Sequence, residues 1–104
     1  MVKNAIVVGN VDANDVIQPQ SNYGKTVDVF APGVSIIGAS ATDIKGFKYL
    51  TGTSQAAPHV SGVVAQYLEL YPNATPQEVE SHLISIAAKD KIPDTRVNTC
   101  SCLN

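Results

Sequence analysis

The sequence predicts an α/β fold, in which short strands form a sheet that a long apolar helix covers. Three observations support this class: short β-branched runs in the first half, an apolar helical pattern over residues 56–71, and a second helix with a clear start at residue 75. The chain has 104 residues, of which 44% are hydrophobic and 15% charged. It is therefore long enough for one domain at most, and apolar enough to fold.

Charge and hydropathy exclude two classes of partner. Seven Lys and Arg residues stand against nine Asp and Glu, which gives a net charge of -2 without a basic patch. We therefore expect no nucleic-acid partner. No apolar run reaches the roughly 18 residues of a membrane span, so we expect no membrane insertion. Residues 1–9 lack a cleavable-signal pattern, and any secretion signal is expected outside this chain.

Two strands are predicted first. Residues 5–9 form a short apolar run of the kind found in a buried strand. Residues 12–25 are polar and include turn-forming residues, which predicts a surface loop. Residues 26–30 alternate in polarity and predict a second strand, which Ala31-Pro32-Gly33 is expected to end.

A hairpin is predicted next. Residues 34–39 and 46–50 are both strand candidates, and residues 41–45 form a connection of suitable length between them.

The first predicted helix spans residues 56–71. Its apolar positions step by three and four, while the opposite face of its first half carries small residues, which favours close packing on several sides. One small domain has little chain left to cover such a helix. The helix therefore indicates a piece of a larger domain.

The second helix has a well-defined start. Thr75 is the expected N-cap, Pro76 suits the first helical position, and Glu78 completes a capping box. One apolar stripe follows, made of Val79, Leu83, Ile86 and Ala87.

The tail carries both cysteines. Cys100 and Cys102 are separated by one residue, which leaves little room for a disulfide between them, and the two histidines lack metal-ligand spacing. A frayed tail is the favoured interpretation.

The most informative segment is residues 52–62, Gly-Thr-Ser-Gln-Ala-Ala-Pro-His-Val-Ser-Gly. A glycine turn brings Ser54 to the start of a helix, where free backbone N–H groups and the helix dipole could stabilise an oxyanion. Pro58 is compatible with this place because it lies near the helix start. The alternative is that Thr53 or Ser54 is simply an N-cap.

Residues 52–62 resemble the nucleophile signature of the subtilisin-like serine proteases, in particular the proteinase-K-like branch. Ile6-Val7-Val8-Gly9, Ser21-Asn22-Tyr23-Gly24 and residues 27–33 agree in order and approximate spacing. The resemblance implies the C-terminal portion of a three-layer α/β/α fold, with a mostly parallel sheet, a β-hairpin before the nucleophile and a buried central helix. It assigns residues 1–91 to a partial catalytic domain and leaves residues 92–104 as an atypical tail.

The resemblance also implies residue roles. Ser54 would be the nucleophile and its N–H half of the oxyanion hole, while Gly52 and Thr53 would shape the supporting turn. Gln55 replaces the usual Met, and so avoids the oxidation that Met undergoes. Asp28 is a weak calcium candidate, together with carbonyls around Lys3 and Ala5, in a complete domain.

The catalytic Asp, the catalytic His and the oxyanion Asn of the family have no match in this chain. Both histidines follow Ser54, whereas the family order is Asp, His, Ser. We expect His59 to be a packed helix residue and His82 to lie on the flank of its helix. Asn10 follows a predicted strand, but at a position where the family usually has a small residue, and is given no role.

The implied function is a serine-type endopeptidase that cleaves proteins or peptides through an acyl-enzyme at Ser54. No cofactor is needed for this chemistry, and secretion is implied by the family. The chain alone is expected to be inactive, its missing partner being the N-terminal part of the same domain. The alternative is a non-catalytic remnant or a protein-binding fragment. An α/β-hydrolase is disfavoured because Ala56 stands where that elbow needs Gly.

Overall fold

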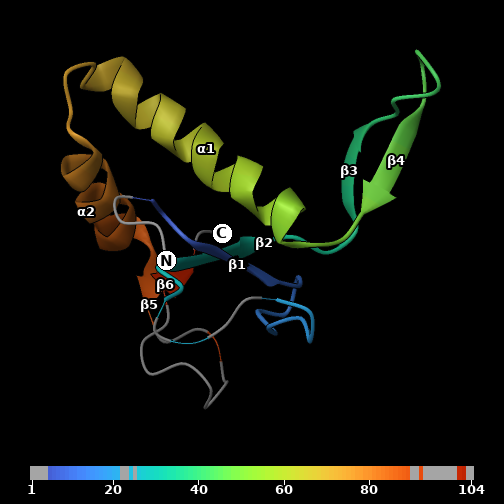
Figure 1. The fold of residues 1–104 in the computed structure, drawn as a ribbon, viewed down its shortest axis with the longest axis horizontal. Helices are drawn as coiled ribbons and strands as arrows, with labels where there is room; N and C mark the ends of the chain where they lie inside the picture. The colour runs from blue at the N-terminus through green and yellow to red at the C-terminus, as the bar shows by residue number, and fades with distance from the viewer. Residues whose placement is uncertain (1–4, 22–23, 25, 90–91, 93–100, 103–104) are drawn as a thin grey trace.

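A computed structural model of the chain describes residues 5–21, 24, 26–89, 92 and 101–102. Four strands form the main sheet in the order β1-β2-β6-β5 (Figure 1). They are β1 (Val8–Val11), β2 (Val29–Pro32), β5 (Ala88–Lys89) and β6 (Ser101–Cys102). The pairings of β1 with β2 and of β2 with β6 are parallel, whereas β5 is antiparallel to β6. The predicted α/β class with a mostly parallel sheet is confirmed.

The strands β1 and β2 lie about three residues later than the sequence predicted. Val8 pairs with Val29 and Gly9 with Phe30, and the burial of β1 increases from Gly9 onward. The apolar run that predicted residues 5–9 therefore marks the approach to the strand. Strand β2 includes Ala31 and Pro32, which were expected to end it. Pro32 is its last residue, and a proline is tolerated there because the N–H is no longer needed for strand pairing.

The loop after β1 contributes to the core, which corrects the expectation of a surface loop. Ile17 is 3% exposed and forms an isolated bridge with Val11. A small hydrophobic cluster contains Val11, Ile17, Phe30 and Ile92, so one residue of the predicted tail is also buried.

The predicted hairpin is confirmed as β3 (Ile36–Ala39) and β4 (Phe47–Leu50), which are antiparallel with Ile36 opposite Leu50. It stands away from the main sheet (Figure 1). Its turn is stabilised locally, since Asp43 Oδ1 accepts the Lys45 N–H at 3.1 Å.

Helix α1 (Thr53–Leu70) begins three residues earlier than predicted, at the turn that carries Ser54. Only Ala56 and Val60 of this helix are buried. Part of the helix has no cover among the described residues, as expected for a piece of a larger domain. Four of its small residues are exposed: Ala57, Ser61, Gly62 and Ala65.

Helix α2 (Pro76–Ile86) has the predicted start. Thr75 Oγ1 accepts the Glu78 N–H at 3.2 Å, and Glu78 Oε2 accepts the Thr75 N–H at 3.0 Å. The predicted stripe is confirmed at Val79, Leu83 and Ala87, but Ile86 is half exposed because it lies on the flank of the helix.

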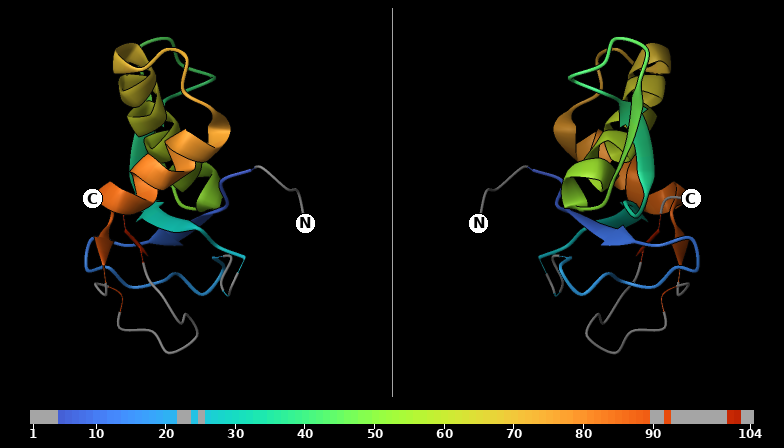
Figure 2. Two further views of the ribbon diagram at one scale, coloured as in Figure 1. Left: turned by 90° about the vertical axis from the view of Figure 1, so that its left-hand side faces the viewer. Right: turned by 90° about the vertical axis from the view of Figure 1, so that its right-hand side faces the viewer.

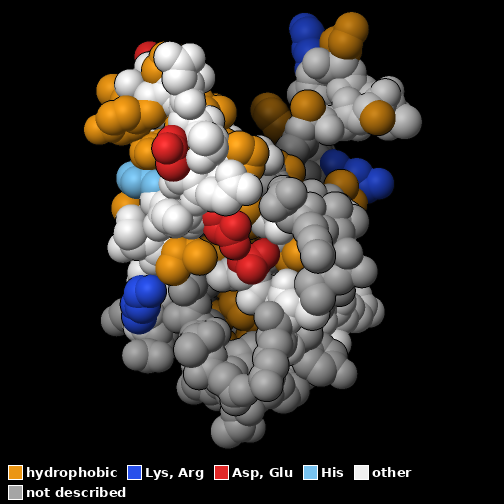
Figure 3. All heavy atoms as spheres, turned by 60° about the vertical axis from the view of Figure 1, so that its left-hand side comes forward, with side chains coloured by type: hydrophobic (Ala, Val, Ile, Leu, Met, Phe, Trp, Pro, Cys, Tyr) orange, Lys and Arg blue, Asp and Glu red, His pale blue; other side chains and the backbone are white. Residues whose placement is uncertain are grey.

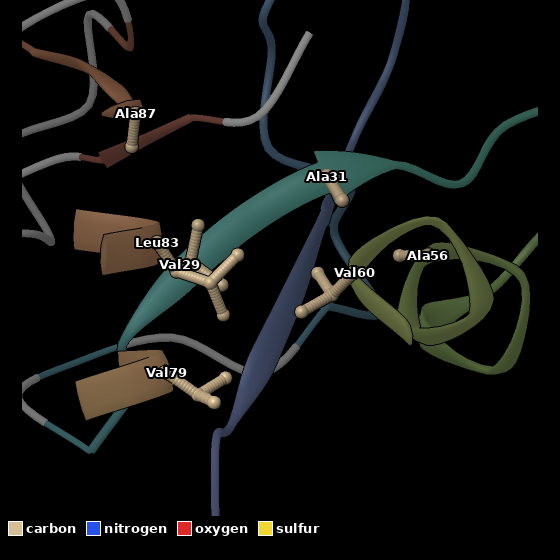
Figure 4. Packing of buried hydrophobic residues seen from close by; sticks show 7 residues of the cluster. All are labelled: Val29, Ala31, Ala56, Val60, Val79, Leu83 and Ala87. Carbon is tan, nitrogen blue, oxygen red and sulfur yellow. The ribbon is translucent and has the colours of Figure 1, made fainter. Parts of the chain in front are cut away.

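The main core lies between the sheet and the two helices, which cover the same side of it (Figure 2). Figure 4 shows side chains from α1, α2 and β2 converging in this core. Its buried members are Val29, Ala31, Ala56, Val60, Val79, Leu83 and Ala87. Neither of the two described helices combines the length and hydropathy needed to cross a lipid bilayer.

The end of the chain differs from a frayed tail. Ser101–Cys102 forms β6, in which Cys102 pairs with Phe30 of β2 on one side and with Ala88 of β5 on the other. Cys100 lies outside the described residues.

Gly9→Ala tests the packing between β1 and β2. The Cβ of an alanine would lie 2.4 Å from Cε1 of Phe30, whose ring is 2% exposed and confined by its cluster. We expect the free energy of unfolding to fall by about 1–3 kcal/mol, because a filled core resists an extra methyl group. Urea unfolding of the protein measures this change.

Gly38→Ala is the matched control. The same methyl group at this position on β3 meets no atom within 4 Å. An equal loss of stability in both variants would contradict the packing argument.

Candidate active site

Ser54 lies in the first turn of α1, with Gly52 as the N-cap residue. Gly52 has φ 158° and ψ 170°, a conformation that side chains rarely adopt, and no side chain caps this helix start. The alternative interpretation of Thr53 or Ser54 as the N-cap is therefore wrong. The side chain of Ser54 is exposed and is free to meet a substrate.

The first turn of α1 leaves the backbone N–H of Ser54 available. Gly52 O accepts the N–H groups of Gln55 and Ala56 at 3.1 and 3.2 Å. Within the described part of the chain, the Ser54 N–H donates no hydrogen bond. A free N–H at the positive end of a helix dipole is suited to stabilise a developing oxyanion.

Hydrogen bonds fasten this turn to the loop that follows β2. The Gly52 N–H donates to Gly33 O at 2.8 Å, and Thr51 Oγ1 accepts the Ser35 N–H at 2.9 Å. The Gly33 N–H in turn donates to Val11 O at 3.1 Å. Ser54 is therefore held at the carboxyl ends of two parallel strands, where α/β folds commonly place their sites.

An open hollow of about 560 Å³ lies between the hairpin and the first turns of α1. Ser54 and Gln55 line it from the helix, and most of the opposite lining is apolar. The lining residues are Ile36, Ile37, Gly38, Ala39, Ala41, Lys48, Leu50, Ser54, Gln55, Pro58 and His59.

Neither histidine is hydrogen-bonded to Ser54 in the described structure. His59 Nδ1 lies 2.9 Å from the Gln55 carbonyl oxygen, one helical turn away. His59 is exposed, so the expected packed environment is not found among the described residues. His82 stacks on Tyr67 with ring centroids 4.1 Å apart, on the flank of α2 as expected.

Three aspartates before Ser54 have local structural roles. Asp12 Oδ1 accepts the N–H groups of Asn14 and Val16 in the loop after β1, and Asp43 stabilises the hairpin turn. Asp28 Oδ2 accepts the Val7 N–H at 2.8 Å. Among the described contacts, none of these carboxylates is hydrogen-bonded to a histidine.

Asp28 fits a calcium site only as one ligand among several. It is half-buried, and no described residue is hydrogen-bonded to its Oδ1. The described residues contain no group of three His, Cys, Asp or Glu that could hold a metal ion, whereas Ca²⁺ takes six to eight oxygens. Lys3 lies outside the described residues.

Asn10, which the sequence left without a role, lies beside this site. It is 2% exposed, and its Oδ1 occupies the space next to Gly33 and close to Gly52. The signal in the sequence was a carboxamide placed where small residues are usual. The sequence could not show that Gly33 and Gly52, which are distant from Asn10 in the chain, lie beside this carboxamide in the fold.

Comparison with known proteins agrees with this geometry. The model of the subtilase family, Peptidase_S8, matches residues 1–99. Subtilisin-like protease 1 of Pseudogymnoascus destructans is 42% identical over 94 residues, which are 90% of this chain and 24% of that protein. The extracellular serine proteinase of a Thermus species is 43% identical over 91 residues, 88% of this chain and 22% of that protein.

A solved structure, of a cold-adapted subtilisin-like serine proteinase, superposes with a TM-score of 0.90 at 39% identity. The superposition covers 96% of this chain and 36% of that one. The chain spans about a quarter of the length of the curated relatives described above. The match over residues 1–99 and the shared fold show that this chain belongs to the subtilase family.

Proposed function

We propose that this chain is the nucleophile-bearing portion of a serine endopeptidase, with Ser54 as the nucleophile. The observation that carries the proposal is the exposed Ser54 at the start of α1 beside its own free N–H. Membership of the subtilase family supports the same role. The substrates we propose are proteins or peptides.

The proposed reaction is acyl transfer. Ser54 Oγ attacks the carbonyl carbon of a peptide bond while a base removes the hydroxyl proton, and negative charge develops on the carbonyl oxygen. The Ser54 N–H is placed to donate to that oxygen. The base then gives its proton to the leaving amine, and water hydrolyses the acyl-enzyme by the same route.

The base, its acidic partner and the second oxyanion donor are proposed to come from residues outside this chain. No described histidine is hydrogen-bonded to Ser54, and His59 uses its Nδ1 within the helix. Without these groups, the 104-residue chain is expected to lose about 10⁴–10⁶ in rate, as triad residues act as a unit.

The second candidate function is a non-catalytic, protein-binding fragment. The observation that favours it is the exposed small-residue face of α1, together with an apolar groove between α1 and α2. Three large hydrophobic residues are also exposed at the end of α1 and on α2, namely Leu70, Tyr71 and Ile86. Figure 3 shows hydrophobic side chains gathered on the side of the molecule that carries the helices. Uncovered surfaces of this kind are typical of protein contacts.

The proposed location is outside the cell. One relative is named an extracellular serine proteinase. It is 43% identical over a stretch that covers 88% of this chain.

Ser54→Ala tests the proposed nucleophile. In the full-length protein, we expect peptide hydrolysis to fall by about 10⁴–10⁶ and labelling by a fluorophosphonate probe to disappear. Ser61→Ala, an exposed serine on the same helix whose hydroxyl donates to Ala57 O, should leave both unchanged. Hydrolysis that survives Ser54→Ala would contradict the proposal, whereas unlabelled full-length protein would favour the non-catalytic alternative.

Gln55→Met tests the departure from the family pattern. The Gln55 Oε1 lies 3.0 Å from where a Cβ on Gly52 would be, so its side chain packs against the turn. A methionine there would become a larger and more polar sulfoxide on oxidation. We expect peroxide to remove most activity from Gln55→Met and to leave the natural protein active. Gln66→Met, exposed on the same helix, is the control and should keep its activity in peroxide.

Structural calcium at Asp28 is a further prediction for the full-length protein. We expect Ca²⁺ to raise the melting temperature of the natural protein and to raise that of Asp28→Asn less. The asparagine retains an oxygen for the Val7 N–H, so the variant separates the charge from the strand contact. An equal calcium-dependent shift in both proteins would exclude Asp28 as a ligand.

A further inference from the structure

Asn10 is a buried polar residue in the middle of β1. Its backbone groups are both satisfied, since its N–H donates to Ser21 Oγ at 2.8 Å and its carbonyl accepts the Gln18 N–H at 3.1 Å. The backbone of Asn10 therefore has a fixed place, and its side chain is held in one region of the interior.

The carboxamide of Asn10 fills the space beside Gly33. A Cβ on Gly33 would lie 2.3 Å from Asn10 Oδ1 and 2.6 Å from Gly52 O. The carboxamide and the Gly52 carbonyl thus share the volume that the missing side chain of Gly33 leaves open. Any other residue at position 33 would displace one of them.

This contact is linked to Ser54 by backbone hydrogen bonds. Gly33 O accepts the Gly52 N–H at 2.8 Å, and Gly52 O accepts the N–H groups of Gln55 and Ala56 in the first turn of α1. A shift of Gly33 would therefore move the Gly52 peptide and, with it, the start of the helix. Ser54 lies between these anchoring points, two residues after Gly52.

The Asn10 Oδ1 has no hydrogen-bond partner in the described part of the chain, although it is fully buried. An unpaired buried acceptor lowers stability, so stability does not explain a carboxamide at this position. Unsatisfied buried groups in native proteins call for a specific explanation. Here the group lies directly against the turn that carries the proposed nucleophile.

We infer that Asn10 is a positioning residue for the nucleophile turn. Its carboxamide braces Gly33 against Gly52 and so sets where the Ser54 hydroxyl and N–H lie. The inference rests on the proposed function of Ser54. It does not follow from the family pattern, since small residues are usual at this position.

The test is Asn10→Ala in the full-length protein. Loss of the carboxamide leaves space beneath the turn, and a misplacement of the nucleophile by a fraction of an ångström lowers the rate. We expect kcat and the rate of fluorophosphonate labelling of Ser54 to fall about tenfold, with KM within about twofold of the natural value. We also expect faster amide exchange at Gly52, whose N–H bonds Gly33, and little change in melting temperature.

Asn14→Ala is the matched control, because Asn14 is exposed in the loop after β1 and its side chain makes no described hydrogen bond. Asn10→Ser gives the same comparison with a smaller truncation, should the alanine variant not fold. An unchanged kcat in a folded Asn10 variant would overturn the inference. A loss of activity that is fully explained by a lower melting temperature of the variant would also overturn it.

The proposed function is judged separately. Activity that persists in Ser54→Ala would refute Ser54 as nucleophile, whatever Asn10 does. Loss of activity in Ser54→Ala together with an unchanged Asn10→Ala would refute the positioning role alone.

Discussion

The hydrogen bond from the Gly52 N–H to Gly33 O joins the two halves of this structure. On one side are the parallel strands β1 and β2, whose carboxyl ends meet at Gly33. On the other is α1, whose first hydrogen bonds are accepted by Gly52. The hairpin connects the two along the chain, and its base is closed by the neighbouring contact between Ser35 and Thr51. The position of Ser54 relative to the sheet therefore depends on this pair of glycines, together with the packing of Ala56 and Val60 in the core.

Glycine is required at both places for different reasons. Gly33 is approached so closely by Asn10 and by the Gly52 carbonyl that a Cβ has no room. Gly52 combines an unusual backbone conformation with the close approach of the Gln55 side chain. The turn thus obtains its rigidity from close contacts on a short backbone instead of from a capping side chain.

The local chemistry of the chain could be predicted from the sequence. The cap of α2, the hairpin and the place of Ser54 each depend on residues a few positions apart. The shift of β1 and β2 could not be predicted, because their register depends on contacts such as that between Gly9 and Phe30, which are 21 residues apart. The site beside Asn10 was missed for the same reason, as it needs Gly33 and Gly52 brought to one point. The earlier start of α1 escaped prediction because Gly52 caps it by conformation, without the side-chain signal that marks Thr75.

The order of the main sheet leaves β1 at one edge, but the loop that follows β1 covers part of that edge. The Asn10 N–H donates to Ser21 Oγ, the Asn10 carbonyl accepts the Gln18 N–H, and Ile17 forms a bridge with Val11. An uncovered sheet edge is a template for pairing with another chain, and a covering loop removes that template. The loop that contributes Ile17 to the core therefore also protects this part of β1 from strand addition between copies of the chain.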